Sequence, residues 1–200
     1  MSDIEKRALA AEVRAEEGEE GQPARIVGHG AVFNSRSEMI MGMFKEEIAP
    51  GAFDDVLGDD VRALFNHDRN FVLGRTVSRT LELSVDAEGL RYDITPPDTQ
   101  SVRDMVLAPL RRGDITGSSF AFRVAPDGDE WREDDDGLIV RTIHRFSRLL
   151  DVSPVTYPAY PEAGAAARSL EERCAEIKGL GQRAINQRRA RERFLEIIGA

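Results

Sequence analysis

The chain has 200 residues, of which 41% are hydrophobic and 32% are charged, and its formal net charge at pH 7 is −9. This length suits one domain with a hydrophobic core and is too short for two large domains. The composition argues against a general nucleic-acid binder, no apolar stretch could cross a membrane, and no signal peptide is evident, so we expect a cytoplasmic protein.

The first half of the chain predicts mostly strands and turns. The expected elements are strands at 7–14 and 26–33, a short helix over 50–57, a strand at 61–65 and a hairpin whose strands are 80–83 and 90–94. An acidic turn at 16–21 separates the first two strands, and Pro50 lies in the first turn of the short helix. Methionines at positions 39, 41 and 43 are typical of packing beneath a loop.

The second half predicts one good helix and two further strand regions. Asp98 or Thr99 follows two prolines and can cap the helix, and Pro109 is expected to kink its end. The apolar residues expected on its buried face are Val102, Met105, Val106 and Leu110. Residues 115–124 and 138–157 then return to strand, separated by an acidic turn at 134–137.

The last part of the chain differs in chemistry from the rest. Residues 168–200 contain eight Arg or Lys and five Glu, a net charge of +3, so residues 1–167 carry −12. Helical spacing of apolar residues here is interrupted at Gly179-Leu180-Gly181. The single cysteine, Cys174, cannot form an internal disulfide. We therefore expect two parts, a β domain over 1–167 and a basic helical tail over 168–200.

The pattern of elements predicts a mainly β fold with flanking helices, of the α+β class. We count about seven strands, mostly antiparallel, without the regular crossover helices of a parallel sheet. A small closed antiparallel β-barrel surrounded by helices, followed by the helical tail, agrees best with this count.

Among the three histidines, His67 is the strongest candidate for chemistry. It follows a short apolar strand in Leu64-Phe65-Asn66-His67-Asp68, and a strand end holds a side chain firmly while leaving it accessible. A histidine of this kind can act as a general base for a serine nucleophile. An isolated histidine is nevertheless more often structural.

A serine pair lies on the predicted strand Gly117-Ser118-Ser119-Phe120-Ala121-Phe122. Because strand side chains alternate, Ser118 shares the face of the phenylalanines, whereas Ser119 lies on the opposite face beside two small residues. Ser119 is therefore the candidate nucleophile, and Ser118 is the alternative. By pattern alone, Ser119 could also be an ordinary solvent-facing serine.

Asp151 is the candidate for a third catalytic role. It lies in the apolar run Leu149-Leu150-Asp151-Val152-Ser153, where an unpaired carboxylate would be costly to bury and an imidazole would satisfy it. His144, seven residues earlier, is the alternative. The histidines are isolated and the acidic clusters resemble solvated turns, so we expect no metal and no cofactor.

These segments resemble the prohead, or capsid-maturation, serine proteases of tailed bacteriophages, which are distantly related to the herpesvirus assemblins. The resemblance spans about residues 6–165 and is carried by seven ordered blocks at 28–34, 47–53, 64–68, 73–75, 111–115, 118–122 and 150–161. It implies an assemblin-type barrel with His67 as general base and Ser119 as nucleophile. In many members an acidic residue, usually glutamate, stands where this chain has Asp151, whereas the herpesvirus relatives use a second histidine.

The resemblance also implies a function. A protein of this kind is a serine endopeptidase that cleaves the scaffolding segment of the major capsid protein, and itself, inside the assembling procapsid in the host bacterial cytoplasm. Its expected partner is the major capsid protein, with a homodimer as one arrangement and with neither nucleic acid nor membrane. Arg75 is a candidate for stabilising the oxyanion or binding substrate. The alternative is a catalytically inactive capsid-assembly or scaffold-binding protein on the same fold.

Overall fold

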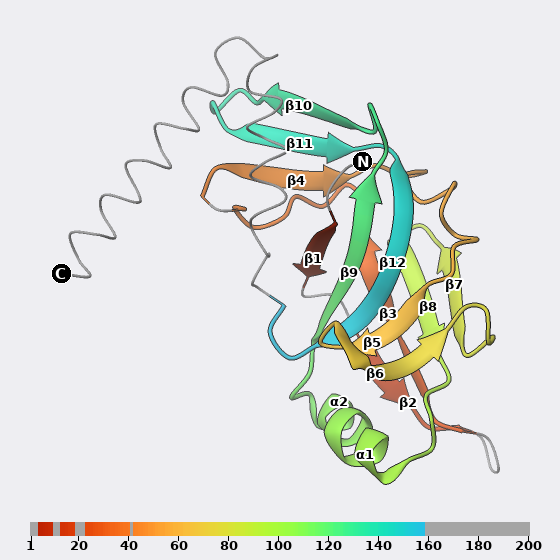
Figure 1. Ribbon diagram of the computed structural model, residues 1–200. Coiled ribbons are helices and arrows are strands. Elements are labelled where there is room, and N and C mark those ends of the chain that lie inside the picture. Colours follow the sequence, from red (N-terminus) through yellow and green to blue (C-terminus); the bar gives the residue numbers. More distant parts are fainter. Residues whose placement is uncertain (1–3, 10–12, 19–22, 41, 159–200) are drawn as a thin grey trace.

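The structure is a computed structural model, and it describes residues 4–9, 13–18, 23–40 and 42–158. This part of the chain forms twelve strands and one helical segment (Figure 1). The strands are β1 (Glu5–Leu9), β2 (Val13–Glu16), β3 (Arg25–Val32), β4 (Phe44–Ile48), β5 (Arg62–Phe65), β6 (Asp68–Arg75), β7 (Leu81–Val85), β8 (Gly89–Ile94), β9 (Gly117–Val124), β10 (Asp129–Glu133), β11 (Ile139–Ile143) and β12 (Phe146–Val155).

The largest sheet has five strands in the order β1-β9-β12-β5-β6. Its two long central strands, β9 and β12, are antiparallel, whereas β5 runs parallel to β12. Two irregularities in the pairing of β9 with β12, at residues 146–148 and 149–151, accompany the strong curvature of β12 in Figure 1. The predicted strand over 115–124 is confirmed as β9.

A second sheet has the order β2-β3-β8-β7, in which β2 and β3 are antiparallel neighbours and β7 and β8 form the predicted hairpin. It packs against the five-stranded sheet, since a Cβ added at Gly30 of β3 would lie 3.3 Å from Val152 of β12 and 3.8 Å from Phe120 of β9. Between them lies a cluster of phenylalanine rings with centroid separations of 4.6 to 5.9 Å, formed by Phe53, Phe120, Phe122 and Phe146. Aromatic burial of this kind is a main source of core stability.

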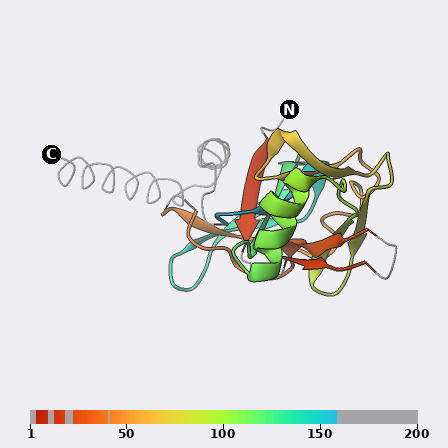
Figure 2. The same ribbon diagram turned by 90° about the horizontal axis from the view of Figure 1, so that it is seen from below.

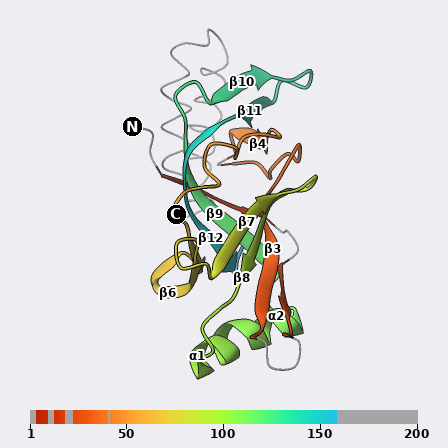
Figure 3. The ribbon, with the colours of Figure 1, turned by 90° about the vertical axis from the view of Figure 1, so that its right-hand side faces the viewer.

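The third sheet, in the order β10-β11-β4, lies at one end of the molecule, with the helical segment at the other (Figure 3). The helical segment comprises α1 (Gln100–Val102), a π-helical turn (Arg103–Leu107) and α2 (Ala108–Arg112). Seen from below, it lies across the end of the molecule (Figure 2). The Thr99 hydroxyl accepts from the Val102 amide and so caps the N-terminus.

Two details of this helix differ from the sequence analysis. Met105 is 52% exposed and Leu107 is buried, so the apolar face is Val102, Val106, Leu107 and Leu110. The wider π-helical turn shifts the helical phase between Val102 and Ala108, which a regular 3.6-residue period cannot anticipate. Pro109 lies immediately after this turn.

The prediction of a closed β-barrel surrounded by helices was wrong. The described strands form three separate open sheets, whose edge strands do not join into one ring, and one helical segment accompanies them. Local alternation identifies strands but not their long-range partners, so it cannot predict whether a ring closes. The count of seven strands also missed β4, β6 and β10. Residues 7–14 are not one strand, because β1 and β2 belong to different sheets. The expected helical tail at 168–200 lies outside the described residues.

The short helix predicted for 50–57 was also wrong. Residues 50–58 are turns held by bonds such as Ala52 to Ala49 and Val56 to Phe53. Each of these hydrogen bonds joins residues three apart in the chain, whereas those of an α-helix join residues four apart. Ala52, Phe53 and Val56 are nevertheless buried, so the apolar residues of this segment join the core as predicted for a helix.

Candidate active site

His67 lies in a tight turn between β5 and β6. Phe65 pairs with Asp68, so Asn66 and His67 form a two-residue hairpin loop with positive φ angles of 53° and 56°. Such φ values suit a primed hairpin turn but cost a histidine on the order of 1–3 kcal/mol. Asn66 secures the turn, since its side chain donates to the Thr156 hydroxyl at 3.1 Å and accepts from the Thr156 amide at 2.9 Å.

The two serines of β9 point to opposite faces, as strand alternation predicts. Ser118 is fully buried and donates to the Tyr92 hydroxyl at 3.0 Å, on the core side. The Oγ atom of Ser119 lies 2.6 Å from Nε2 of His67. Ser119 is therefore the serine that the fold brings to the histidine.

Asp151 completes a chain of three polar side chains. Its Oδ1 atom lies 2.5 Å from Nδ1 of His67 and accepts from the Ser153 hydroxyl at 2.9 Å. The register explains the proximity, since Ser153 of β12 pairs with Ser119 of β9, and Asp151 lies two residues along the same face. The carboxylate requires a proton on Nδ1, which leaves Nε2 free to accept the proton of Ser119.

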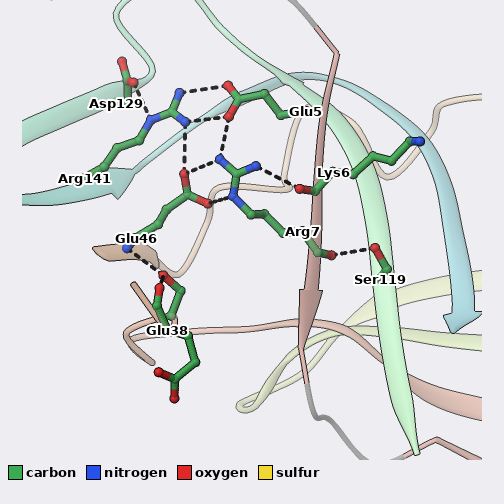
Figure 4. Close-up of polar contacts among 9 residues, drawn as sticks. Glu5, Lys6, Arg7, Glu38, Glu46, Ser119, Asp129 and Arg141 are labelled. Carbon is green, nitrogen blue, oxygen red and sulfur yellow. Dashed lines mark hydrogen bonds and ion pairs between the residues drawn. The ribbon is translucent and has the colours of Figure 1, made fainter. Parts of the chain in front are cut away.

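Ser119 has a second neighbour, the edge strand β1. The Ser119 Oγ atom lies 2.8 Å from the carbonyl oxygen of Arg7. Figure 4 draws this contact as a dashed line. The single hydroxyl proton can point to this carbonyl or to His67, and attack on a substrate requires the second arrangement. Ser119 is 2% exposed, so β1 and the histidine together cover the hydroxyl.

A buried cluster of charges holds β1 against the third sheet (Figure 4). Arg7 binds Glu46 of β4 at 2.7 Å, and Arg141 of β11 binds Glu5 at 2.8 Å, Glu46 at 3.0 Å and Asp129 at 2.7 Å. Burial alone would raise the pKa of the Glu5 carboxyl, but Arg141 and Arg7 outweigh it and hold that pKa below its ordinary value. The cluster therefore fixes the strand that carries the Arg7 carbonyl.

The structure does not bring the other two candidates to Ser119. His144 is half exposed, and its Nε2 atom lies 3.7 Å from Glu130. Arg75 donates to Asp60 through Nε at 2.7 Å and Nη2 at 2.6 Å, and β12 and β5 lie between its strand and β9. These hydrogen bonds lower the pKa of Asp60 to about 2. Arg75 thus belongs to an ion pair at the sheet edge, contrary to the expected role at the oxyanion.

A cleft of about 370 Å³ opens beside the triad, and His67 and Asp151 form part of its wall. Among the described ranges, no group of three or more His, Cys, Asp or Glu residues could hold a metal ion. In the same part of the chain, no helix is long and apolar enough to span a membrane.

A serine, an imidazole and a carboxylate joined in this order have the arrangement found in serine hydrolases of the acyl-transfer class. Comparison with known families agrees with this class. A family model described as caudovirus prohead serine protease matches residues 10–176, and the chain belongs to that family. No curated protein and no solved structure matches it.

Sequence reasoning missed two contributors to the site. Ser153 shares a strand face with Asp151, a parity visible in the sequence, but a serine two residues from a carboxylate is too common to be informative. The Arg7 carbonyl carries no sequence signal at all, because any residue has one. Its position depends on the pairing of β1 with β9, across more than a hundred residues of chain.

Replacing Asp151 by asparagine is expected to lower kcat by about 10³ to 10⁴, since the neutral amide cannot stabilise the imidazolium and its N–H group can donate to Nδ1, which favours the wrong tautomer. His144→Ala is the matched control and should change kcat less than about twofold, since its half-exposed side chain lies next to Glu130. Both variants would be assayed for peptide cleavage, with circular dichroism to confirm folding. The reverse ranking would assign the third role to His144.

Replacing Ser153 by alanine tests a positioning role. The Ser153 hydroxyl donates to Asp151 at 2.9 Å and lies 3.3 Å from Nδ1 of His67. Its loss is expected to lower kcat by about tenfold with little change in KM, because the hydroxyl orients the Asp151–His67 pair. Steady-state kinetics would measure both parameters. An unchanged kcat in a folded variant would show that Asp151 and His67 need no such support.

Proposed function

We propose that this chain is a serine endopeptidase that cleaves the scaffolding segment of a major capsid protein, and its own chain, during procapsid maturation. The observation that carries the proposal is the continuous contact from Ser119 Oγ to His67 Nε2 at 2.6 Å and from His67 Nδ1 to Asp151 Oδ1 at 2.5 Å. The family supplies the capsid context. The site of action would be the interior of the assembling procapsid in the host bacterium.

The reaction follows from this contact. Ser119 Oγ attacks the carbonyl carbon of a peptide bond while its proton passes to His67 Nε2, and Asp151 stabilises the imidazolium. Collapse of the tetrahedral intermediate breaks the C–N bond, and the leaving amine takes the proton from Nε2. The acyl group is then bound to Ser119 as an ester. Water, deprotonated by His67, attacks this ester and restores the free serine and a carboxylic acid.

The burial of Ser119 favours the second candidate function, an inactive capsid-assembly protein on the same fold. The two are separated by labelling with a serine-directed fluorophosphonate, followed by incubation with the full-length capsid protein of the same virus. The protease requires labelling of wild type that Ser119→Ala removes, and cleavage products of the capsid protein by mass spectrometry. Absence of labelling and of cleavage products in a folded chain would favour the inactive capsid-assembly protein.

A further inference from the structure

The cleft beside the triad crosses the open face of the five-stranded sheet. Strand pairing places Lys6 opposite Ala121, Ala121 opposite Asp151, and Asp151 opposite Arg62, and all four residues line the cleft. Ala121 lies two residues beyond Ser119 on β9, a distance of about 7 Å along a strand. A peptide side chain in this cleft would therefore belong to a residue within about two positions of the bond that Ser119 attacks.

The cleft is basic, although the whole chain carries a net charge of −9. Its cationic side chains are Lys6, Arg62, Arg69 and Arg148, and its carboxylates are Asp60 and Asp151. Both carboxylates already have partners, since Asp60 pairs with Arg75 and Arg62 and Asp151 contacts His67. The excess charge of the cleft is therefore positive.

Arg69 is an arginine of the cleft without an ion pair among the described residues. Arg148 is 3.3 Å from Asp59, and Arg62 is 3.1 Å from Asp60, whereas Arg69 is exposed and makes no ion pair within the described residues. Its position follows from the pairing of β5 with β6, in which Phe65 pairs with Asp68 but Leu64 pairs with Val72. Residues 69–71 thus bulge out of the ladder, and a bulge commonly redirects a side chain beside an active site.

The remaining wall is apolar and partly open to solvent. Ile4 and Val72 line the cleft with exposures of 38% and 45%, together with Leu64. Apolar walls lower the local dielectric, so a carboxylate that enters would interact with a guanidinium more strongly than it does in water.

We propose that Arg69 is a specificity-determining residue that selects substrates with Asp or Glu within about two residues of the scissile bond. This inference rests on the proposed endopeptidase function and names its substrate class as acidic peptide segments. The guanidinium of Arg69 forms a charge-assisted, bidentate pair with the substrate carboxylate. Apolar neighbours of the acidic residue pack against Ile4 and Val72.

The test uses the full chain and pairs of peptides that span a mapped cleavage site and differ only by Glu or Gln at the acidic position. We expect wild type to prefer the Glu peptide by at least about tenfold in kcat/KM, and Arg69→Gln to bring this ratio close to one. Arg69→Glu should reverse the preference toward a peptide with lysine at that position. Arg79→Gln, an exposed arginine outside the cleft, is the matched control and should keep the wild-type ratio.

A second measurement keeps the inference separate from catalysis. Fluorescence anisotropy of the same peptides on the Ser119→Ala chain should show the Glu preference, and loss of that preference on adding Arg69→Gln. Equal binding of the Glu and Gln peptides, or an equal loss for both in the Arg69 variant, would overturn the specificity role. Failure of the proposed function would show differently, as absence of fluorophosphonate labelling and of cleavage in wild type.

Discussion

Replacing Ser119 by alanine is expected to abolish peptide cleavage, with kcat reduced on the order of 10⁶-fold, the scale found when a triad nucleophile is removed. The reason is geometric, because Ser119 is the β9 hydroxyl 2.6 Å from the imidazole. Ser118→Ala should retain most of the activity, since that hydroxyl points to Tyr92 on the core side.

The two variants form a matched pair, because they remove the same atom from adjacent residues of one strand. Ser118→Ala should cost about 1–2 kcal/mol of stability, since it leaves the buried Tyr92 hydroxyl without its partner. Thermal unfolding would measure this loss beside the cleavage rates. Equal loss of activity in two folded variants would contradict the assignment of Ser119 as the sole nucleophile.

Much of the site could be anticipated from local patterns. The alternation on β9 places Ser119 on the strand face that Phe120 and Phe122 do not share. A carboxylate in the apolar run at 149–153 needs a partner if it is buried. The resemblance to prohead proteases joined these residues to His67, and the fold brings all three together. Parity gives the direction of Ser119 and Asp151 because both lie on strands, whereas His67 lies in the β5–β6 turn, where parity does not apply.

The parts that local reasoning could not reach depend on pairing between distant strands. β1 joins the sheet of β9, while β2, only a few residues later, joins the sheet of β3. No period in the sequence distinguishes this arrangement from one continuous strand. The prediction of a closed barrel was wrong for the same reason, since the register that closes a ring is a property of all the strands together.

The buried charges around Arg141 are the clearest case of a feature invisible to patterns. Alternation alone does not decide whether the strand face that carries Glu5, Glu46 or Arg141 is buried or exposed. Charged residues are usually exposed, so the sequence would place all three at the surface. Each is at most 4% exposed in the fold. They are tolerated because two arginines and three carboxylates satisfy one another across β1, β4, β10 and β11.

Replacing Arg141 by alanine is therefore expected to lower the free energy of unfolding by about 3–5 kcal/mol, since it leaves buried carboxylates with too few partners. This is a large part of the 5–15 kcal/mol typical of a domain. Arg132→Ala on the neighbouring strand is the control. Its side chain is 43% exposed and pairs with Glu47, so its loss should cost less than about 1 kcal/mol. Urea unfolding followed by fluorescence of Trp131 would measure both.

The double replacement Arg141→Met with Glu46→Gln makes the prediction specific to charge. Removing one buried charge of each sign leaves Arg7 paired with Glu5, so part of the lost stability should return relative to Arg141→Ala. A loss below 1 kcal/mol in the single variant would show that the cluster does not hold β1. A large loss that the double variant fails to reduce would point to the cation–π contact with Trp131 instead, because the guanidinium lies 5.3 Å from the centre of that ring and methionine replaces only the apolar stem.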